Sequence, residues 1–124
     1  MRILLIDDDV DLCQLTKKVL TKSGYTVDAF YEADLGVKQA RLMKPNLILM
    51  DIMLPGLSGP EVISSLKKES QFKDVPVIFL TGLVTGSEED PGNEGIMVGG
   101  IKYQTLGKPY EIDRLLAMVK KYAK

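Results

Sequence analysis

The sequence predicts an α/β protein with a doubly wound parallel sheet. Short, continuous apolar runs recur along the chain, and segments with apolar residues at helical spacing lie between them. The runs are too short for helices and lack the alternation of half-exposed strands, so they indicate strands buried on both faces, as in parallel sheets. Strands that alternate with helices are typical of right-handed crossovers and of helices on both faces of the sheet. We expect one domain over residues 1–124.

Three buried strands and two edge strands are expected. The buried strands are the apolar runs 3–6, 47–50 and 75–80, each of which is followed by an acid or a threonine. Residues 25–30 and 101–105 instead alternate between apolar and polar side chains, which predicts the two edges of the sheet.

Helical spacing predicts helices between the strands and a last helix after them, over residues 10–22, 32–43, 59–69 and 109–124. In the first helix the inward stripe is expected to be Leu12, Leu15, Val19 and Leu20. Gly24 follows this helix, where a left-handed cap is expected. Ser58 is the expected N-cap of the third helix.

Residues 82–100 interrupt the alternation. They contain six of the 11 glycines and four acids, and no Lys or Arg occurs from residue 74 to 101. Because each interior glycine costs a helix about 1 kcal/mol, we expect a mobile acidic loop with at most a short helix near residues 96–98. The loop is either plainly solvent-exposed or a segment that binds a ligand or partner.

Composition excludes several classes of protein. A net charge of −1 offers no general attraction to nucleic acid or to an anionic membrane, and no apolar run is long enough to span a bilayer. The N-terminus does not resemble a signal peptide. Cys13 is the only cysteine, which fits a reducing, cytoplasmic compartment and predicts an inert, structural thiol. The chain has no histidine, so catalysis or metal binding by its own histidines is excluded.

Polar residues follow the expected strands at one edge of the sheet. Ligands of open parallel sheets bind beyond the carboxyl ends of the strands, where the strand order reverses. If the first and third strands are neighbours, at least three carboxylates converge there, and they repel one another unless a cation lies among them. The residues that follow the strands are Asp7, Asp8, Asp9, Asp51, Thr81 and Lys108.

These residue types predict a magnesium site that supports phosphoryl transfer. Mg²⁺ is a hard ion that prefers oxygen ligands and keeps several waters. Lys108 adds positive charge for an anion, and Thr81 adds a hydroxyl. Phosphoryl transfer needs such groups, because it depends on positioning and on neutralising the phosphoryl oxygens.

Four sequence pieces resemble the receiver domain of two-component response regulators. They are LLIDDD, LILMDIMLPGLSG, VIFLTG and GKP, and the resemblance covers essentially the whole chain. It implies a flavodoxin-like fold with five parallel strands in the order 2-1-3-4-5. It also implies a phosphoacceptor rather than an enzyme, whose partner is a sensor histidine kinase or a histidine phosphotransfer protein. No direct nucleic acid or membrane partner is expected.

The resemblance implies a role for each matching residue. Asp51 would be the phosphoacceptor. Mg²⁺ would be held by Asp8, by Asp51 and by the backbone carbonyl of Met53, with Asp7 acting through a metal-bound water. The phosphoryl oxygens would be bound by the side chains of Thr81 and Lys108.

Two features depart from the family pattern. The family usually has an aromatic residue three positions before the lysine, and its rotation reports phosphorylation. Here that position is Thr105, and Tyr103 lies two residues further back. The segment from Thr81 to Lys108 is several residues longer than usual and contains the glycine-rich stretch, so an atypical or disordered fourth helix is expected.

Three alternatives stay open from the sequence. Asp7, Asp8 and Asp9 could serve only as a helix N-terminus, and we assign the cap to Asp9. The Asp7-x-Asp9 spacing also fits a phosphatase similar to the haloacid dehalogenases, with Asp7 as the nucleophile, although Asp11 replaces the expected Thr or Val. The third alternative is a receiver-like interaction module that is never phosphorylated. We expect either a stand-alone receiver or a part of a longer protein.

Overall fold

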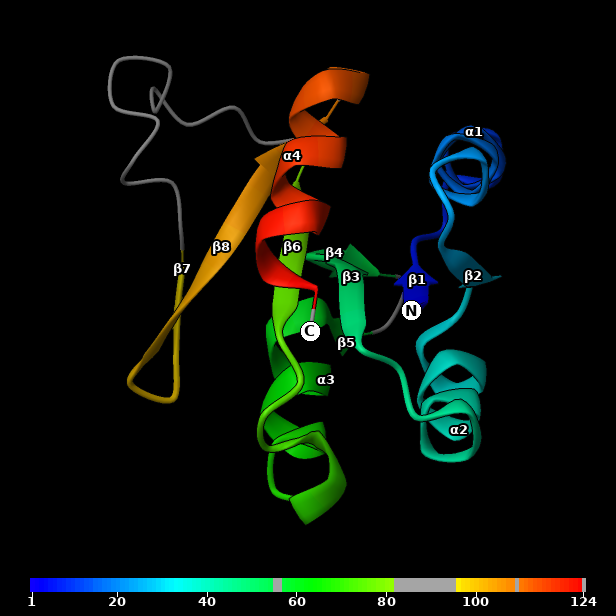
Figure 1. Cartoon of the computed structure of the whole chain (residues 1–124). Helices are drawn as coiled ribbons and strands as arrows, with labels where there is room; N and C mark the ends of the chain where they lie inside the picture. Colours follow the sequence, from blue (N-terminus) through cyan, green and yellow to red (C-terminus); the bar gives the residue numbers. More distant parts are fainter. Residues whose placement is uncertain (55–56, 82–95, 109, 124) are drawn as a thin grey trace.

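A computed structural model describes residues 1–54, 57–81, 96–108 and 110–123 (Figure 1). One sheet has the strand order β2-β1-β3-β6-β8-β7. The first five strands in this order pair in parallel, which confirms the predicted order 2-1-3-4-5. The strands are β1 (Arg2–Ile6), β2 (Thr26–Phe30), β3 (Leu47–Asp51), β6 (Val77–Thr81), β7 (Ile96–Val98) and β8 (Ile101–Gly107).

Helices cover both faces of the sheet, as predicted. α1 and α4 lie on one face, and α2 and α3 lie on the other (Figure 1). A two-stranded ribbon of β4 (Met53–Leu54) and β5 (Leu57–Ser58) follows β3. The helices are α1 (Val10–Lys22), α2 (Ala33–Met43), α3 (Gly59–Leu66), the short 3₁₀ helix η1 (Ser70–Phe72) and α4 (Ile112–Tyr122).

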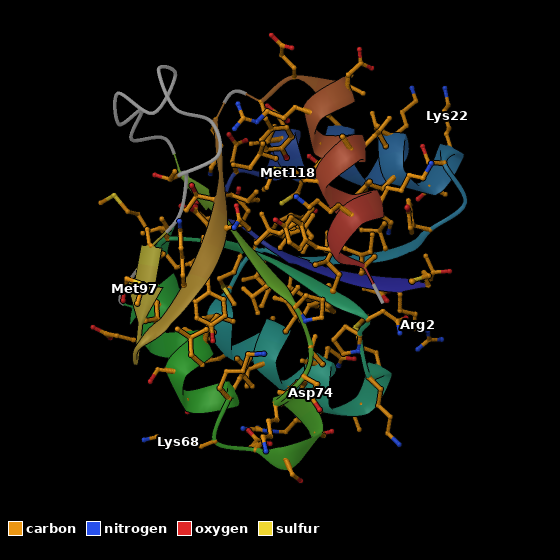
Figure 2. The ribbon with its side chains drawn as sticks, turned by 60° about the vertical axis from the view of Figure 1, so that its left-hand side comes forward. Arg2, Lys22, Lys68, Asp74, Met97 and Met118 are labelled. Carbon is orange, nitrogen blue, oxygen red and sulfur yellow. The ribbon has the colours of Figure 1, made fainter. Side chains whose placement is uncertain are left out.

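The apolar core consists of two clusters, one on each face of the sheet. Both are built from alternate residues of the same strands. In β1, Ile3 and Leu5 pack with the side chains of α1 and α4, whereas Leu4 and Ile6 pack with those of α2 and α3. All four side chains are buried. A strand buried on both faces needs apolar residues at every position, which is why its sequence reads as a continuous run. Figure 2 shows the side chains that fill the space on both sides of the sheet.

Three predicted helix boundaries are confirmed. The Asp9 carboxylate accepts the backbone N–H of Leu12 at 3.1 Å and caps α1. Ser58 caps α3 in the same way, with its hydroxyl 3.3 Å from the backbone nitrogen of Glu61. Gly24 follows α1 with a φ of 98°, a conformation that costs glycine little because it has no Cβ.

The end of α3 and the inward face of α1 differ from the prediction. α3 ends at Leu66 rather than at residue 69, because η1 follows and buries Phe72 in the core. In α1 the buried face is Cys13, Thr16 and Leu20, whereas Leu15 is half exposed. The predicted stripe placed Leu15 inward because only apolar residues were counted, and Thr16 occupies the centre of the real buried face.

The edge beyond β8 was predicted wrongly. Residues 96–98 form the strand β7 rather than a short helix, and β7 pairs antiparallel with β8, so β8 is not the edge strand. Gly99 and Gly100 connect the two strands with φ values of 57° and 82°. A two-residue turn with positive φ at both positions matches the twist of a hairpin, and apolar residues on either side of Gly-Gly were the available signal.

The predicted mobile loop and the question of a fourth helix fall mainly on residues 82–95, outside the described residues. Within the part of the chain that the structure describes, no helix is long and apolar enough to cross a bilayer.

Candidate functional site

The carboxyl ends of the parallel strands bring the predicted residues to one edge of the sheet. Asp51 is the last residue of β3, and Asp7 follows β1, its neighbour in the sheet. The strand order reverses between β1 and β3, since the chain runs from β1 outward to β2 and then returns to β3 on the other side. Thr81 ends β6, and its carbonyl accepts the backbone N–H of Lys108 at 2.7 Å.

Three carboxylates converge at this edge. Asp7, Asp8 and Asp51 each offer an oxygen that lies within 4.8 Å of the others. Asp7 is 1% and Asp51 4% exposed, whereas Asp8 is exposed to solvent. Asp9 is outside this group: it caps α1 and donates its backbone N–H to Oδ1 of Asp7 at 3.0 Å. The helix-cap alternative therefore holds for Asp9, while its neighbours face the site.

Lys108 bridges the two buried carboxylates. Its Nζ lies 2.8 Å from Oδ2 of Asp7 and 3.3 Å from Oδ2 of Asp51. Burial lowers the pKa of the Lys108 ammonium, but the hydrogen bonds and charges of Asp7 and Asp51 outweigh burial and raise the pKa above its ordinary value. The ammonium therefore stays charged at neutral pH.

Asp51 titrates unusually high for a carboxyl group. Burial is the largest cause, and the nearby charge of Asp7 adds to it; together they raise the pKa of Asp51 from 3.8 to about 6. The ammonium of Lys108 and the backbone N–H of Met53, 3.2 Å from Oδ1 of Asp51, act in the opposite direction. At neutral pH the carboxylate is mostly ionised, so its oxygen can act as a nucleophile.

The donor set fits a hard divalent cation. Among the described residues, three carboxylates face the one ammonium of Lys108, so negative charge remains in excess when all of them are ionised. Oxygen donors from carboxylates, with one exposed side that admits water, match the preference of Mg²⁺ for oxygen ligands and retained waters. Asp8 provides that exposed side.

Comparison with known proteins gives the family. The model of the response regulator receiver domain matches residues 3–120. The chain belongs to the response regulator receiver domain family. It is 37% identical over 119 residues to the phosphate regulon transcriptional regulatory protein PhoB of Escherichia coli, a match that covers 96% of this chain and 50% of PhoB.

Further relatives and solved structures are similar to this chain over nearly its whole length. The DNA-binding dual master transcriptional regulator RpaA of Synechocystis is 34% identical, with 96% of this chain and 47% of RpaA covered. The chemotaxis protein CheY4 of Vibrio cholerae has the same fold, with a TM-score of 0.82, 23% identity, and 98% and 97% of the two chains covered. A two-component response regulator from Clostridium difficile has a TM-score of 0.79 at 26% identity, with 98% and 94% covered. The chain spans about half the length of the curated relatives that it matches.

The position of the usual family aromatic is filled by a small, buried residue in this receiver domain. Thr105 lies on the face of β8 that packs toward α2 and α3 and is 9% exposed. Tyr103 lies on the same face, with its ring edge-on to Phe79 at a centroid distance of 5.5 Å and an angle of 88°. The aromatic ring is therefore packed in the core two residues away from the position where the family has it.

Two residues support the site through contacts that were not predicted from the sequence, although Cys13 is the buried, unreactive thiol that was expected. Gly59 begins α3, and a Cβ there would lie 2.2 Å from the carbonyl oxygen of Asp51. Cys13 in α1 donates its thiol to the carbonyl of Asp7 at 3.3 Å. Burial first, and then the charge of Asp7, raises the pKa of Cys13 to about 12, so the thiol stays protonated. For Gly59, the available signal in the sequence was a glycine directly after the predicted cap Ser58, because a glycine there allows the helix to approach the backbone of Asp51 closely.

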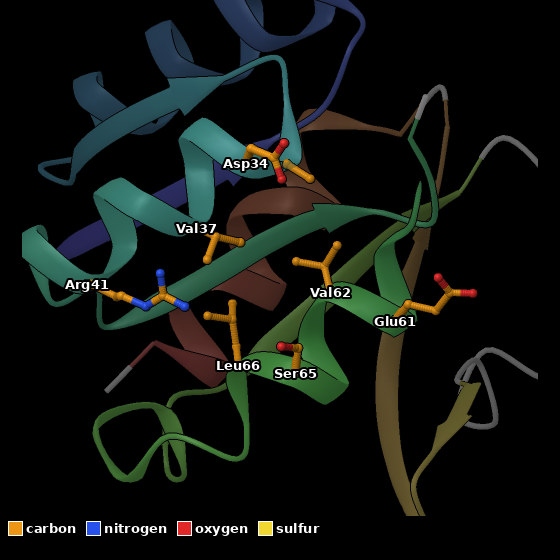
Figure 3. Close-up of a pocket in the computed structure, with 8 residues that line it drawn as sticks. Asp34, Val37, Arg41, Glu61, Val62, Ser65 and Leu66 are labelled. Atoms are coloured by element: carbon orange, nitrogen blue, oxygen red, sulfur yellow. The ribbon is translucent and has the colours of Figure 1, made fainter. Parts of the chain in front are cut away.

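A separate hollow of about 380 Å³ lies between α2 and α3 (Figure 3). Val37 and Val62 face it from the two helices, and Arg41 lies at one end, where its guanidinium also pairs with Glu69. The residues that line this hollow do not include those of the carboxylate site, so we assign the chemistry to the edge of the sheet.

Proposed function

We propose that this receiver domain accepts a phosphoryl group on Asp51 from a sensor histidine kinase or a histidine phosphotransfer protein, in a reaction that depends on Mg²⁺. The modified protein signals through altered contacts with another protein, and it acts in the cytoplasm as a phosphoacceptor rather than as an enzyme on other substrates. The observation that carries the proposal is the convergence of Asp7, Asp8 and Asp51 with Lys108 between the two buried carboxylates.

In the reaction, one carboxylate oxygen of Asp51 attacks the phosphorus of the donor's phosphohistidine. The new bond joins this oxygen to phosphorus, and the bond from phosphorus to the imidazole nitrogen breaks. The electron pair stays on that nitrogen, which takes up a proton. The products are an acyl phosphate on Asp51 and a free histidine on the donor.

The surrounding residues position the phosphoryl group and neutralise its charge. Asp8, Asp51 and the backbone carbonyl of Met53 would hold Mg²⁺, with Asp7 acting through a metal-bound water. When bound, the ion would neutralise charge on the phosphoryl oxygens. Lys108 would move from the Asp51 carboxylate to a phosphoryl oxygen, and the hydroxyl of Thr81 would bind another. Both contacts would pull the ends of β6 and β8 toward Asp51. This movement would change the surface that another protein contacts.

The test is incubation with a small acyl phosphate and Mg²⁺, followed by measurement of the intact mass. The wild-type protein should gain one phosphoryl group, and Asp51→Asn should gain none, because the amide cannot form the acyl phosphate. Asp34→Asn, which removes an exposed acid on α2, is the matched control and should gain the group as the wild type does.

Two outcomes would contradict the proposal. A gain that persists in Asp51→Asn but is lost in Asp7→Asn would indicate the phosphatase-like chemistry, which membership of the receiver family does not favour. Absence of any gain from the small donor and from histidine kinases would leave the interaction module that is never phosphorylated.

A further inference from the structure

Two hydroxyl groups from distant parts of the chain meet beside the site. The hydroxyl of Thr16 on α1 shares a hydrogen bond with the phenolic hydroxyl of Tyr110, which lies between β8 and α4. Thr16 is 1% exposed, in the middle of the apolar face that α1 turns toward the sheet. A buried hydroxyl needs a partner, and among the described residues every buried side-chain polar atom has one.

The same face of α1 contacts the site on two sides. Cys13 and Thr16 are one helical turn apart, so their side chains point in the same direction. Cys13 donates its thiol to the backbone carbonyl of Asp7, on the carboxylate side of the site. Thr16 reaches Tyr110, two residues beyond Lys108, on the ammonium side. α1 therefore contacts the backbone of Asp7 directly and contacts Tyr110, which follows Lys108 by two residues.

The segment that carries Lys108 is held from two directions. On the side of the sheet, its backbone N–H donates to the carbonyl of Thr81 at 2.7 Å. On the side of α1, the described contact is the Thr16–Tyr110 hydroxyl pair. The lysine side chain is long and flexible, so the placement of its ammonium depends on how firmly the backbone beneath it is fixed.

We propose that the Thr16–Tyr110 hydroxyl pair positions Lys108, and that both residues act as positioning residues for phosphoryl transfer. This inference rests on the proposed function. Phosphoryl transfer depends on placing charges accurately, so an ammonium displaced by a fraction of an ångström stabilises the transferring group less well. The hydrogen bond described for these two side chains joins them to each other and not to Asp51.

The experiment removes each hydroxyl with little change in shape. Tyr110→Phe and Thr16→Val delete one partner each, and the double variant deletes both. Thr16→Ser keeps the hydroxyl and serves as the conservative rescue. Tyr25→Phe is the matched control, because Tyr25 is half buried against the same core cluster as Tyr110 but lies at the far end of α1.

Two quantities are measured for each variant. The first is the rate of phosphoryl uptake from a small acyl phosphate with Mg²⁺, as a function of donor concentration. The second is the ¹⁵N and ¹H signal of the Lys108 ammonium in the unmodified protein. We expect Tyr110→Phe and Thr16→Val each to lower the rate at saturating donor by about tenfold, with little change in the half-saturating concentration. The double variant should lose no more than either single one, and the Lys108 signal should shift or broaden in all three.

Several results would overturn the inference. One is a Tyr110→Phe protein with an unchanged Lys108 signal and an unchanged rate of phosphoryl uptake, and another is a double variant in which the two losses of rate multiply. The others are a Thr16→Ser protein that takes up the phosphoryl group as slowly as Thr16→Val, or a Tyr25→Phe protein that is as slow as Tyr110→Phe. If Tyr110→Phe fails to fold, the comparison of Thr16→Ser with Thr16→Val decides alone. If the wild type takes up no phosphoryl group, the proposed function fails, and the Lys108 signal still tests the positioning.

Discussion

Asp51 and Asp7 are buried side by side, and the ammonium of Lys108 lies between them. Such an arrangement costs stability, because the pKa of Asp51 rises to about 6 through burial and the charge of Asp7. Residues placed for chemistry often oppose folding in this way. Under the proposed function, the same property would make the carboxylate responsive to a cation or a phosphoryl group that arrives from solvent.

Stability should therefore fall as Asp51 ionises. From about pH 4 to about pH 6 the folded protein keeps a proton on Asp51 that the unfolded chain has already lost, so the free energy of unfolding decreases as pH rises through this window. The decrease due to this group is roughly 2–3 kcal/mol. In the absence of divalent cations, Asp51→Asn should remove it and be the more stable protein at neutral pH.

Urea unfolding of the two proteins at several pH values measures this effect. The difference between the wild-type and Asp51→Asn curves reports the contribution of Asp51, because carboxyl groups distant from it are the same in both proteins. A difference that stays constant from pH 4 to pH 7 would contradict the assignment of the raised pKa to Asp51.

At the scale of elements, the start of α3 is fixed by its contact with the end of β3. Gly59 lies so close to Asp51 that a side chain would meet its carbonyl oxygen, and the Gly59 N–H donates to the carbonyl of Ile52 at 2.7 Å. The cap Ser58 and the proline at position 60 define where the helix begins. The start of α3 is therefore in direct contact with the end of β3.

Gly59→Ala should separate them. The new Cβ would lie 2.2 Å from a backbone oxygen that cannot rotate away, so we expect a loss of about 1–3 kcal/mol in the free energy of unfolding. Gly107→Ala is the control, since no atom lies within 4 Å of a Cβ at that position, and its effect should stay within about 0.5 kcal/mol. Chemical denaturation compares the two, and equal losses would show that the close approach to Asp51 is not the cause.

The β7–β8 hairpin shows how an element can be misjudged. Its glycines were counted as helix breakers over the whole of residues 82–100, and this argument against a helix was sound for 96–100. It did not predict the hairpin that forms instead. That prediction requires the apolar residues on the two sides of Gly99–Gly100 to be considered as two paired strands that a turn connects.

For the whole molecule, a divalent cation should act as a stabilising ligand. It would bind the folded protein, in which the carboxylates of Asp7, Asp8 and Asp51 converge, and would find no such site in the unfolded chain. At about 100 times the dissociation constant, Mg²⁺ should add about 2.7 kcal/mol to the free energy of unfolding. Thermal unfolding with increasing Mg²⁺ measures this gain.

Neighbouring acids provide the matched variants. Asp8→Asn should lose most of the stabilisation by Mg²⁺, because Asp8 belongs to the converging group and is exposed, so the substitution disturbs no core contact. Asp9→Asn should keep it, since Asp9 is outside the group and asparagine also caps helices well. If Asp8→Asn gains as much as the wild type, the ion does not bind at the proposed place.

The alternation of strands and helices along the chain, the buried strands and the caps at Asp9 and Ser58 could be predicted from the sequence, because each depends on neighbouring residues or on a period of the chain. The converging acids were predicted from the rule that ligands bind beyond the carboxyl ends of parallel strands, and the strand order from the resemblance to receiver domains. The rest depends on segments that are distant in sequence. The tertiary structure alone decided that Lys108 bridges Asp7 and Asp51, that Thr16 pairs with Tyr110, and that β7 covers the edge of β8. The physical reason is that local propensity and periodicity fix how a segment folds, whereas distances between charges and hydroxyls arise only when the packed sheet and its helices bring separate segments together.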